Sequence, residues 1–596
     1  MTEKAPKTEF ISIFAYWSKN DFIEENTLTY LKELKRVSSL VLFVSNSPIA
    51  KSQLQILSRL NIKILLRENF GYDFWAWKEG ILLLQNEIKR SENLILCNSS
   101  CFLAFGNLSF VLSKLDSKAN IWGLSSYKSA SIPFHLQSYF LLFKKEILQN
   151  WEAFISFWKQ IPHMKNWQEA VKFGEIKLTN YYLRLGFKCA SFVPPAVLPS
   201  EDVDPTIFYP THLLSFGSPL VKKKLFMQSY SHFLSSSYGN SAASAFEYIK
   251  NNSGYYEEIL RGLINSTTPT QLLQILHLNY LIDPNNIQNF HKHYESKTAL
   301  ICFVYYKDMI NYMCEIILRF HGIAEIFIVS SERSLLDSYE KKLGGAQLSL
   351  NFRYKENRGR NEAAYFLSCK DVWLNHDYIC ALHDKKTSHA SPALLGIDFM
   401  KHCEQHLAPS NEGILQIIEL FEKNKLLGLL TPPPPVFGTF TSSLHNPIGR
   451  NLTSLAELNQ NFFNGRLFDE KKGIDVFSAP FGGMFWARSK ALTPLLEIKL
   501  NINDFPKEPI KVSDGTTLHA LERSYPLIVR SSGFYTARII NIVLLPTLFD
   551  NLLYINFLTA IKDKIILMTK NKVKKYINNH PILFKMTKYL YTRFLF

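Results

Sequence analysis

A run of polar residues follows an apolar stretch in the second half of the chain, in LHDKKTSH at 382–389. Carboxylate oxygen and imidazole nitrogen are metal ligands, so Asp384 and His383 are candidates to bind Mg²⁺ or Mn²⁺. Lys386 offers a compact positive charge to a phosphate group. A strand before these residues would place them at the edge of a sheet, where ligands bind. The alternative is a polar loop that only contacts water.

A second group of polar residues surrounds a turn in RENFGYDFWAWKEG, residues 67–80. Asn69 and Gly71 are residue types that tolerate positive φ, which lets the backbone approach a ligand closely. Asp73 could accept hydrogen bonds from ribose hydroxyls, and Arg67 could contact phosphate. The same residues suit a structural turn, with Asp73 favoured near a helix N-terminus. This stretch alone leaves both interpretations open.

The turn recurs in the second half of the chain, in KENRGRNEAAYF at 355–366. Asn357 and Gly359 repeat the Asn-x-Gly pattern, and Asn361 stands where the first copy has an aspartate. An amide can hydrogen-bond a ribose hydroxyl, but it carries no charge for a metal or a cation. We therefore count Asn357, Gly359 and Asn361 as candidate ligand-binding residues of a second site.

The main candidates for acid–base catalysis lie in DGTTLHALERSY, residues 514–525, which predicts a helix. His519 and Glu522 fall on adjacent turns, and we prefer Glu522 as a general base. An ion pair between Glu522 and Arg523 is equally consistent with the sequence. Asp514 is placed to cap the start of the helix.

The first half of the chain has polar residues of its own. The stretch HLQSYF supplies His135, Gln137 and Ser138, whose side chains suit the hydroxyl groups of a sugar. Asn98 follows an apolar run in ILCNSSCF and is a further candidate for ligand binding. Glu175 in FGEIKLTN is an additional candidate acid.

The same order of elements is predicted to position these residues in both halves of the chain. Apolar, β-branched runs alternate with amphipathic stretches, which predicts parallel βαβ units with helices on both faces of a sheet. The predicted strands are 10–17, 40–46 and 62–69 in the first copy, and 298–306, 324–331 and 348–357 in the second. The predicted helices lie near 21–37, 52–60, 307–321 and 335–343.

Composition indicates a large globular protein. The 596 residues predict two to four domains, and 47% hydrophobic content excludes a disordered chain. The eight cysteines form no C-x-x-C pair, which favours reduced thiols in a cytoplasmic protein over a zinc ribbon or disulfide framework. No P-loop, H-E-x-x-H or G-x-S-x-G motif is present. The N-terminus predicts a flexible lead and not a signal peptide, and no uncharged apolar run is long enough to cross a bilayer.

Half of the net charge lies at the end of the sequence. Residues 559–596 hold nine Lys or Arg and one Asp, which is +8 of the chain's +16. Apolar residues recur at helical spacing between these lysines, so basic amphipathic helices that lie on anionic lipid are expected. The alternative is a helix that packs on the protein and shows its lysines to water. Nucleic acid is not an expected partner, because aromatic and basic residues do not interleave elsewhere.

The succession of motifs resembles the rhamnan-synthesis protein F family, bacterial glycosyltransferase-like proteins of rhamnose-rich polysaccharide assembly. The first half carries the resemblance in RENFGYDFWAWKEG, ILCNSSCF, WGLSS, HLQSYFLLFKKEIL and YPTHLL. The second half carries it in KENRGRNEAAYFL, YICALHDKKTSH, FSAPFGGMFWAR and DGTTLHALERSY. The resemblance covers most of residues 10–540. It implies GT-A-type transferase domains, which use a nucleotide-sugar donor and often a divalent metal.

The resemblance also bears on single residues. It places Arg488 on the acceptor side, near phosphate or a sugar hydroxyl; the alternative is an interior strand that ends in a surface arginine. The chain departs from the family pattern once in each half. Ser99 stands where the pattern has an aspartate after the buried strand, and Asn361 stands where an acid is expected after Gly-Arg.

We therefore expect an α/β fold of two tandem GT-A-like (Rossmann-like) domains with mainly parallel sheets. The expected parts are a first domain at 1–200, a mostly helical linker at 201–295, a second domain at 296–545 and basic amphipathic helices at 546–596. The expected activity moves a deoxyhexose such as rhamnose from a nucleotide sugar to a lipid-linked or polysaccharide acceptor, at the inner face of the bacterial plasma membrane. The catalytic candidates are Asp384, Glu522, His519 and Arg488. The alternative is an inactive glycan- or nucleotide-binding subunit of a polysaccharide assembly complex.

Overall fold

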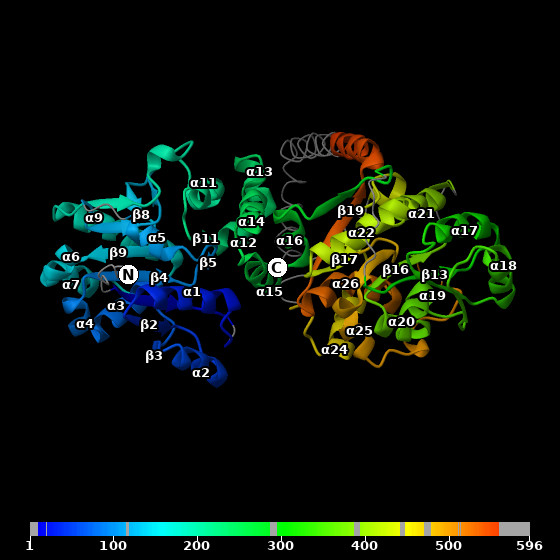
Figure 1. The fold of residues 1–596 in the computed structure, drawn as a ribbon, viewed down its shortest axis with the longest axis horizontal. Coiled ribbons are helices and arrows are strands. Elements are labelled where there is room, and N and C mark those ends of the chain that lie inside the picture. The colour runs from blue at the N-terminus through cyan, green and yellow to red at the C-terminus, as the bar shows by residue number, and fades with distance from the viewer. Residues whose placement is uncertain are drawn as a thin grey trace, which may run out of the picture. The chain divides into compact units, whose positions relative to one another are not determined.

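The chain forms two compact units that follow one another in sequence, with the division between Leu278 and Asn279 (Figure 1). We call them unit 1 and unit 2. The computed structural model describes residues 10–19, 21–114, 118–286, 295–386, 392, 394–441, 447–469, 478–510, 512 and 514–558. The basic segment predicted at 559–596 lies outside the described residues.

Unit 1 is built on a seven-stranded sheet of order β10-β6-β9-β4-β1-β2-β3. β9 is antiparallel to both of its neighbours, and the other pairs are parallel. The central strand β1 is buried along its whole length, as expected where helices cover both faces of a parallel sheet. The strands are β1 (Phe10–Tyr16), β2 (Leu40–Ser45), β3 (Lys63–Leu66), β4 (Asn93–Asn98), β6 (Ile121–Gly123), β9 (Phe140–Lys144) and β10 (Cys189–Ser191).

Two short strand pairs accompany this sheet. β5 (Cys101–Leu103) pairs with β11 (Leu220–Lys222), and β7 (Ser126–Tyr127) pairs with β8 (His135–Leu136), both antiparallel. The second pair is a hairpin that follows β6 directly in the chain.

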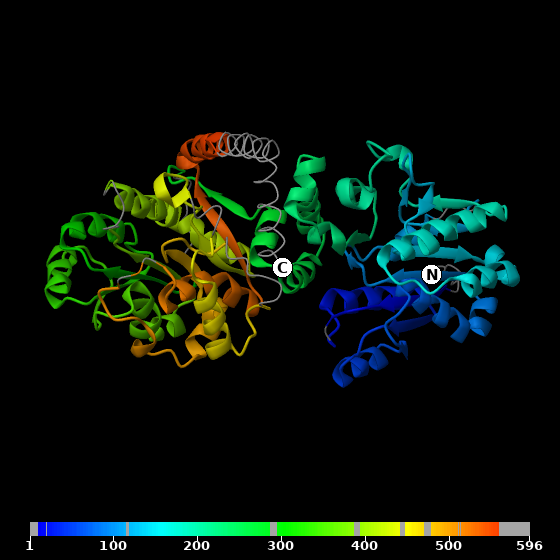
Figure 2. The same cartoon turned by 180° about the vertical axis from the view of Figure 1, so that it is seen from behind.

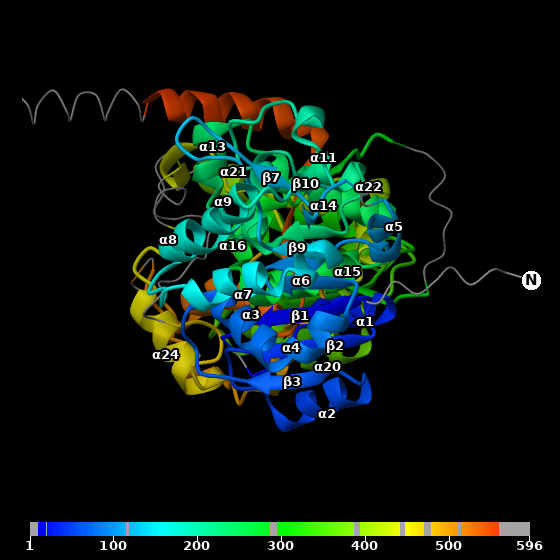
Figure 3. The same ribbon diagram turned by 90° about the vertical axis from the view of Figure 1, so that its left-hand side faces the viewer.

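Alternation along β1 divides the interior of unit 1 into two cores. Ile11 and Ile13 point into one core, and Phe10 and Phe14 point into the other, because successive side chains of a strand face opposite sides. Figure 3 shows α1 and α5 on one side of the sheet and α7 and α9 on the other. The first core is covered by α3 (Tyr72–Leu83), α4 (Gln85–Arg90), α6 (Lys145–Gln149), α7 (Trp151–Gln160) and α9 (Lys177–Arg184). The second is covered by α1 (Glu25–Val37), α2 (Lys51–Arg59), α5 (Leu108–Ser113) and α11 (Pro210–Ser215).

The helices after residue 201 belong to unit 1 as far as Leu278. Ion pairs tie them to α1: Lys223 Nζ lies 2.5 Å from Glu24 Oε2, and Arg261 Nη1 lies 3.1 Å from Glu25 Oε2. These helices are α10 (Pro205–Phe208), α12 (Lys223–Met227), α13 (Tyr230–Ser236), α14 (Ser241–Asn252), α15 (Tyr256–Ser266) and α16 (Pro269–Ile275).

Unit 2 repeats the strand order of unit 1. Its eight-stranded sheet has the order β12-β19-β17-β18-β16-β13-β14-β15, and β18 is the strand antiparallel to both neighbours. β13, β14, β15, β16 and β18 thus correspond to β1, β2, β3, β4 and β9. The α/β class with mainly parallel sheets is confirmed. The strands are β12 (Asn279–Ile282), β13 (Thr298–Val304), β14 (Glu325–Ser330), β15 (Leu350–Tyr354), β16 (Tyr378–His383), β17 (Leu427–Thr431), β18 (Phe485–Arg488) and β19 (Tyr535–Asn541).

Helices cover both faces of the unit 2 sheet as well (Figures 1 and 2). Phe485 joins a core with α20, α24, α25 and α26. Its neighbour Trp486 faces the other way, where Nε1 donates to the carbonyl of Leu407 at 2.7 Å. The helices are α17 (Ile310–Leu318), α18 (Arg333–Leu343), α19 (Arg360–Ala363), α20 (Lys370–Asn375), α21 (Leu394–Leu407), α22 (Asn411–Lys423), α24 (Leu452–Phe463), α25 (Thr493–Glu497) and α26 (Thr517–Ser531).

The structure bears on two further predictions, the state of the cysteines and the presence of membrane-spanning helices. All eight cysteines are free, and all but Cys189 are buried, as expected of reduced thiols. Within the described part of the chain, the structure holds no helix long and apolar enough to cross a membrane.

Candidate functional site

The repeated turn has the same backbone conformation in both units. Gly71 has φ 68° and Tyr72 has φ 57°, immediately before and at the start of α3. Gly359 has φ 73° and Arg360 has φ 42°, immediately before and at the start of α19. The left-handed region favours glycine, which explains why both copies carry Gly at this position. Asp73 and Asn361 therefore occupy equivalent positions.

Replacing Gly359 by alanine is expected to destabilise unit 2 by about 2–4 kcal/mol, because a left-handed φ and a steric clash add together. A Cβ at this position would lie 2.7 Å from the Cβ of Ala363 and 2.8 Å from the Phe505 ring. Gly322 offers a matched control, since its φ is 71° and a Cβ there meets nothing within 4 Å. Gly322→Ala is expected to cost about 1–2 kcal/mol in urea unfolding. Equal losses in the two variants would show that the clash is relieved.

The residue after the fourth strand is also equivalent in the two units. Ser99 N donates to the carbonyl of Ala15 at 3.0 Å, and Asp384 N donates to the carbonyl of Phe303 at 3.2 Å. Since β4 lies beside β1 as β16 lies beside β13, Asp384 is the counterpart of Ser99. Unit 1 thus carries Asp73 with Ser99, whereas unit 2 carries Asn361 with Asp384. Each unit therefore has an acid at only one of the two positions, which is Asp73 in unit 1 and Asp384 in unit 2.

Asp384 is a buried carboxylate with one oxygen that has no partner. Its Oδ2 accepts hydrogen bonds from the backbone N–H groups of Tyr305 and Tyr306, both at 2.8 Å. No hydrogen-bond donor among the described residues contacts the buried Oδ1. Burial raises the pKa of Asp384 to about 6, against the two backbone hydrogen bonds that lower it. An ionised carboxylate with a free oxygen is suited to a cation or a hydrogen-bond donor of a ligand.

His383 is turned into the protein. Its Nδ1 lies 2.8 Å from the carbonyl oxygen of Asp384, and its Nε2 lies 2.6 Å from the carbonyl oxygen of Gly482. Burial, followed by the charge of Lys385, lowers the pKa of His383 to about 4, so the ring is neutral at pH 7. Both ring nitrogens face backbone oxygens, which leaves Asp384 as the stronger of the two metal-ligand candidates.

The carboxylate of Glu522 contacts the loop before β18, in which the Gly482 carbonyl faces His383. Gly482 N donates to Glu522 Oε1 at 3.0 Å. In unit 1 the equivalent residue, Ser138, donates its N–H to Glu175 Oε2 at 2.6 Å. The equivalence follows from strand register. Phe485 pairs with Ala381 of β16, and Leu141 pairs with the equivalent residue Leu96 of β4. Gly482 and Ser138 lie three residues before Phe485 and Leu141. Each unit therefore places a glutamate from a later helix beside this backbone N–H.

Glu362 is a carboxyl group of unit 2 that the sequence did not reveal as a candidate. It is 0% exposed, its Oε1 accepts from Asn361 Nδ2 at 2.9 Å, and Oε2 has no partner among the described residues. Burial, reinforced by the nearby Glu522, raises its pKa well above the usual range. Burial and the charge of Glu522 thus both favour the neutral form of Glu362. The signal in the sequence that could have identified Glu362 is its position directly after Asn361 in the repeated turn.

Basic side chains surround this edge of unit 2. Lys386 forms an ion pair with Asp308, and Arg360 Nε lies 2.8 Å from Glu508 Oε1. Burial lowers the pKa of Lys385 and lowers that of Lys355 to about 8. These cations sit on segments that follow β15 and β16, at the carboxyl edge of the sheet. The edge is suited to an anionic ligand.

The first turn of α26 differs in part from the prediction. Arg523 Nη2 pairs with Asp514 Oδ1 at 3.4 Å, and no ion pair between Arg523 and Glu522 is found among the described residues. Asp514 does not cap the helix: its carboxylate accepts from Arg450 N at 3.0 Å, and the N-cap residue is Thr516. His519 Nδ1 lies 2.8 Å from the Thr516 hydroxyl, and burial lowers the pKa of His519.

Arg488 lies away from this edge, which corrects its expected place on the acceptor side. β18 is antiparallel to β16, so Arg488 pairs with Tyr378 at the beginning of β16 and not with its end. Its Nη2 donates to the carbonyls of Phe421 at 2.7 Å and Asn424 at 3.2 Å, and its Nε donates to that of Leu427 at 3.0 Å. These bonds give Arg488 a structural role at the opposite edge of the sheet.

Asn357 and Asn69 are exposed residues of their turns. Arg67 is not exposed, because its side chain folds back on the turn. Its Nη1 donates to Asn46 Oδ1 at 2.8 Å and to the Phe70 carbonyl at 3.0 Å, and its Nη2 lies 2.9 Å from Glu79 Oε1. Both Nη atoms are thus held by the protein, whereas the buried Nε has no hydrogen-bond partner among the described residues. Contact of Arg67 with phosphate stays a prediction.

The polar residues predicted in unit 1 gather around Asp73. Asn98 Nδ2 donates to Asp73 Oδ2 at 2.7 Å, and Asn98 Oδ1 accepts from the Ser100 hydroxyl at 2.5 Å. Burial raises the pKa of Asp73 to about 6, and the positive charge of Lys222 opposes that rise. Lys222 comes from β11, far along the chain, and no sequence signal marked it.

A second part of the unit 1 cluster centres on Glu175. Its Oε1 lies 3.5 Å from His135 Nε2, and its Oε2 accepts from the Ser138 hydroxyl at 2.6 Å. Burial opposes ionisation, but His135, Lys222 and Ser138 outweigh it and lower the pKa of Glu175 to about 2. Gln137 is occupied elsewhere, since its Nε2 donates to Asp204 Oδ1 at 2.9 Å. Most donors and acceptors of this cluster are thus satisfied by one another.

A family model and two curated relatives connect the chain to known proteins. A family model described as rhamnan synthesis protein F matches residues 41–534. The chain is 28% identical over 158 residues to the uncharacterized protein y4gN of Sinorhizobium fredii, covering 26% of this chain and 41% of that protein. It is 26% identical over 237 residues to the uncharacterized protein WxcX of Xanthomonas campestris pv. campestris, covering 39% of this chain and 32% of that protein. The chain spans less than half the length of both relatives.

Solved structures with some similarity include two glycosyltransferases. GlyE of Streptococcus pneumoniae has a TM-score of 0.24 and 11% identity, and the match covers 66% of this chain and 90% of that one. A glycosyltransferase involved in glycosylation of the major capsid of PBCV-1 has a TM-score of 0.20 and 12% identity, covering 36% and 92%. At such scores the fold rests on the strand order described above. The family model, which covers most of the sequence, decides the relationship: the chain belongs to the rhamnan synthesis protein F family.

Proposed function

We propose that the protein is a glycosyltransferase of cell-surface polysaccharide synthesis and that unit 2 binds its nucleotide-sugar donor. Membership of the rhamnan synthesis protein F family supports the polysaccharide and a rhamnose-like deoxyhexose as the transferred sugar. The observation that carries the placement is Asp384, a buried carboxylate with an unpartnered oxygen directly after β16. Ligands of open α/β sheets bind at this edge, and unit 1 has Ser99 at the equivalent position.

The charges around Asp384 suit a nucleoside diphosphate. Lys385, Lys386 and Arg360 lie on segments that leave the carboxyl edge of the sheet, and positive side chains neutralise the leaving diphosphate as charge develops. Mg²⁺ or Mn²⁺ fits as well, with Asp384 Oδ1 as the protein ligand. Mg²⁺ is held in such sites by one or two carboxylates together with substrate phosphates. The described residues contain no cluster of three or more His, Cys, Asp and Glu that could hold a metal alone, in keeping with that mode. Such a metal would add positive charge at the diphosphate.

Glu522 is placed to act on the acceptor. Its Oε1 accepts from Gly482 N, and its position in α26 brings it to the loop that also contacts His383. A carboxylate there can accept the proton of the acceptor hydroxyl as the glycosidic bond forms. Glu362 lies close enough to Glu522 for the two carboxyl groups to interact electrostatically, and this interaction raises the pKa of Glu362.

The proposal is tested by incubating the full chain with a panel of nucleotide sugars and a rhamnose-containing oligosaccharide. Transfer or donor hydrolysis with a deoxyhexose nucleotide supports it, and loss of either after chelation of divalent metal supports the role of Asp384. Absence of turnover with every donor, combined with measurable nucleotide binding, would assign the alternative function of an inactive binding subunit.

We also propose that the protein attaches to the inner face of the plasma membrane through its C-terminal region. The described helix at 545–558, orange-red in Figure 1, has an exposed apolar stripe at helical spacing. Its residues, each at least 40% exposed, are Leu545, Phe549, Leu552, Leu553 and Phe557. Contiguous exposed apolar side chains mark membrane or protein interaction sites. The stripe precedes the basic segment 559–596 in sequence, and both are typical of contact with anionic lipid.

Removing residues 559–596 is expected to abolish most sedimentation of the protein with vesicles that contain anionic phosphatidylglycerol. The nine cations of this segment contribute about 1 kcal/mol each near such a surface. The intact protein should not sediment with vesicles of neutral phosphatidylcholine. A wash with 0.5 M salt, where the Debye length is about 4 Å, should release it from the anionic vesicles. Unchanged sedimentation of the truncated protein would exclude this attachment.

A further inference from the structure

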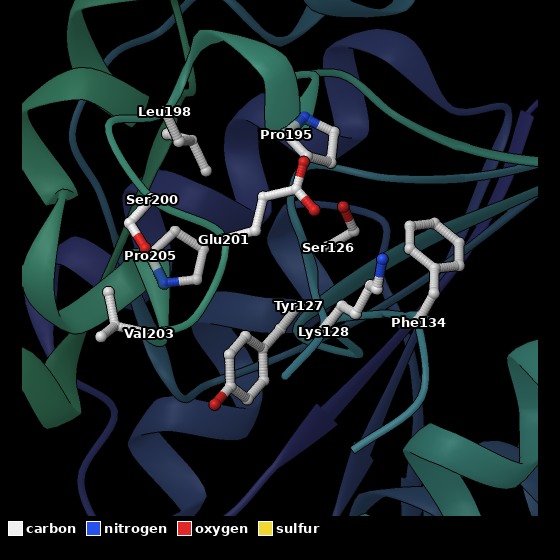
Figure 4. A pocket seen from close by; sticks show the side chains of 10 residues that line it. All are labelled: Ser126, Tyr127, Lys128, Phe134, Pro195, Leu198, Ser200, Glu201, Val203 and Pro205. Atoms are coloured by element: carbon white, nitrogen blue, oxygen red, sulfur yellow. The ribbon is translucent and has the colours of Figure 1, made fainter. Parts of the chain in front are cut away.

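Unit 1 and unit 2 each have a feature to which the proposed reaction gives no role. In unit 1 it is a surface hollow between Tyr127 and Glu201 (Figure 4). The interior of this hollow holds about one water molecule, which is too little for a sugar or a nucleotide. In unit 2 it is Glu362, a buried carboxyl group in α19 beside the loop that contacts Glu522. Of the two features, Glu362 has chemistry that the reaction can use.

The carboxyl group of Glu362 is incompletely hydrogen-bonded. Its side chain is 0% exposed, and its Oε1 accepts from Asn361 Nδ2 at 2.9 Å. Its Oε2 has no hydrogen-bond partner among the described residues. Burying a polar group without full hydrogen bonding costs free energy, so native proteins keep such a group where it serves a site or holds ordered water.

The duplicated fold shows that no carboxyl group is needed at this position. Counted from the glycine of the repeated turn, Glu362 corresponds to Phe74 and Tyr365 corresponds to Trp77. Phe74 and Trp77 are buried core residues of unit 1, and Trp77 Nε1 donates to the Cys97 carbonyl at 3.0 Å. The buried hydroxyl of Tyr365, in contrast, has no partner among the residues that the structure describes. Glu362 and Tyr365 are therefore a polar pair of unit 2 that its architecture does not require.

Glu362 and Glu522 reach the same loop from two different helices. Glu522 Oε1 accepts from Gly482 N at 3.0 Å. A Cβ on the next residue, Gly483, would lie 3.1 Å from Glu362 Oε1, so this carboxyl group lies against the loop as well. Burial raises the pKa of Tyr365 well above its usual range, and the charges of Glu362 and Glu522 add to this rise. The three side chains thus form one polar group beside the loop before β18.

The unpartnered oxygens of this group suit an ordered water. Buried water makes about three hydrogen bonds to polar groups that have no other partner, and Glu362 Oε2 and the Tyr365 hydroxyl are two such groups. No direct hydrogen bond joins Glu362 to Glu522 in the described part of the chain. In its neutral form Glu362 has one O–H donor, which a water can relay to the carboxylate of Glu522. A donor directed at a carboxylate fixes its orientation and favours its ionised form.

We propose that Glu362 is a positioning residue of the transfer reaction, which as a neutral hydrogen-bond donor orients the Glu522 carboxylate, through a bound water, toward the acceptor hydroxyl. The proposal rests on the proposed function. There the acceptor oxygen forms its bond to the sugar as the bond to the diphosphate breaks, and the acceptor proton passes to Glu522. Glu362 itself does not touch the substrate. Besides Glu362 and Tyr365, the described titratable side chains that interact with Glu522 stay unchanged in the test; they are His383, Lys385, Cys403 and His519.

The test compares Glu362→Leu and Glu362→Gln in the full chain. Leucine removes the donor, so kcat should fall about ten-fold with an unchanged KM for the nucleotide sugar. The acidic limb of the pH–rate profile should move up by about one pH unit, because the ionised form of Glu522 loses a hydrogen bond. Glutamine keeps an oxygen for Asn361 and offers an N–H in place of the O–H, so it should restore most of kcat and the position of the limb.

Two further variants separate this role from packing. Tyr365→Phe removes only a hydroxyl group that the water would contact, and it should raise the same limb by a smaller amount even if the leucine variant fails to fold. Phe74→Leu is the matched control, since it changes the corresponding buried residue of unit 1. It should leave kcat per folded molecule and the pH–rate profile unchanged.

The ionisation of Glu522 gives a readout that does not depend on activity. It can be followed by ¹³C NMR of labelled glutamate carboxyl groups, with the signal of Glu522 assigned by its absence in Glu522→Gln. The midpoint of this titration should rise by about one pH unit in Glu362→Leu.

A wild-type acidic limb in both Glu362→Leu and Tyr365→Phe would overturn the inference. A Glu362→Gln variant as slow as the leucine variant would also overturn it, because the charge of Glu362 and not its donor would then be needed. If the wild type turns over no donor, the proposed function fails, and the NMR midpoint of Glu522 alone decides the inference. Transfer with an unshifted midpoint would leave the proposed function standing and remove the role of Glu362.

Discussion

Replacing Asp384 by asparagine is expected to lower sugar transfer at least about a hundred-fold and, at the same pH, to make the protein more stable. The loss of activity follows because the unpartnered Oδ1 is the oxygen that unit 2 offers to a metal or to the donor. An amide in its place carries no charge, and removing one electrostatic contact to a transition state typically costs about a hundred- to thousand-fold.

The gain in stability follows from the pKa of Asp384, which burial raises from 3.8 to about 6. Below pH 4 the carboxyl is protonated in both the folded and the unfolded protein, so its contribution to folding is most favourable there. As the pH rises through 6 the folded state must ionise a buried group, and that contribution is lost. At pH 7 the difference corresponds to roughly 3 kcal/mol. Asparagine removes this cost.

Urea unfolding of wild type and Asp384→Asn at pH 7 and pH 4 measures the effect. The variant should be more stable by about 1–3 kcal/mol at pH 7, and the difference should shrink at pH 4. Buried charges that reduce stability while they serve activity are the usual basis of such a trade-off. A variant that is both fully active and no more stable would contradict the placement of the site in unit 2.

Two variants of unit 1 control for this result. Ser99→Ala changes the equivalent position and should leave transfer unchanged. Asp73→Asn gives unit 1 the amide that unit 2 carries at Asn361, and it should also keep transfer. Activity that depends on Asp73 and not on Asp384 would move the donor site to unit 1.

The features that the sequence predicted well are local and repeated. The turn at Gly71 was recognisable because its echo at Gly359 needs the same left-handed backbone, and a glycine records that need in the sequence. The difference between Asp73 and Asn361 could be read for the same reason, whereas the departure at Ser99 was recognised from the family pattern. Strands β1 and β2 and their counterparts β13 and β14 were predicted because buried parallel strands are apolar along their length.

The features that were missed depend on direction and on distant contacts. Arg488 ends an apolar run, but only pairing shows that its strand is antiparallel and ends at the opposite edge of the sheet. Arg67 has the length to reach a ligand, yet it folds back to Glu79. Lys222 reaches Asp73 only because β11 pairs with β5, and a short pair of distant strands leaves no periodic signal.

Glu522→Gln and Glu175→Gln are expected to give opposite results, although the two glutamates are structural counterparts. Each accepts a backbone N–H, from Gly482 at 3.0 Å and from Ser138 at 2.6 Å, and glutamine retains an oxygen for that bond. If Glu522 is the base, its loss should lower kcat about 10²- to 10⁴-fold. The free energy of unfolding should change by less than about 1 kcal/mol, because the bond to Gly482 is kept and no ion pair to Glu522 is found among the described residues.

Glu175 presents the reverse case. Its pKa is held at about 2 by His135, Lys222 and Ser138 despite burial, so its ionised form stabilises the folded state above the unfolded pKa of 4.5. That contribution is lost only as the pH falls toward 2, and at pH 7 its removal is expected to cost about 2–3 kcal/mol. Transfer per folded molecule should not change.

The pair of variants therefore separates catalysis from architecture at one position of a duplicated fold. Activity is measured as kcat at saturating donor, and stability as urea unfolding at pH 7. The pH–rate profile of the wild type should lose an acidic limb in Glu522→Gln, a change that a purely structural role of this residue would not produce. If Glu522→Gln instead loses stability and keeps its kcat, the carboxylate has only supported the Gly482 loop, as Glu175 supports the backbone at Ser138. The base would then have to come from another residue.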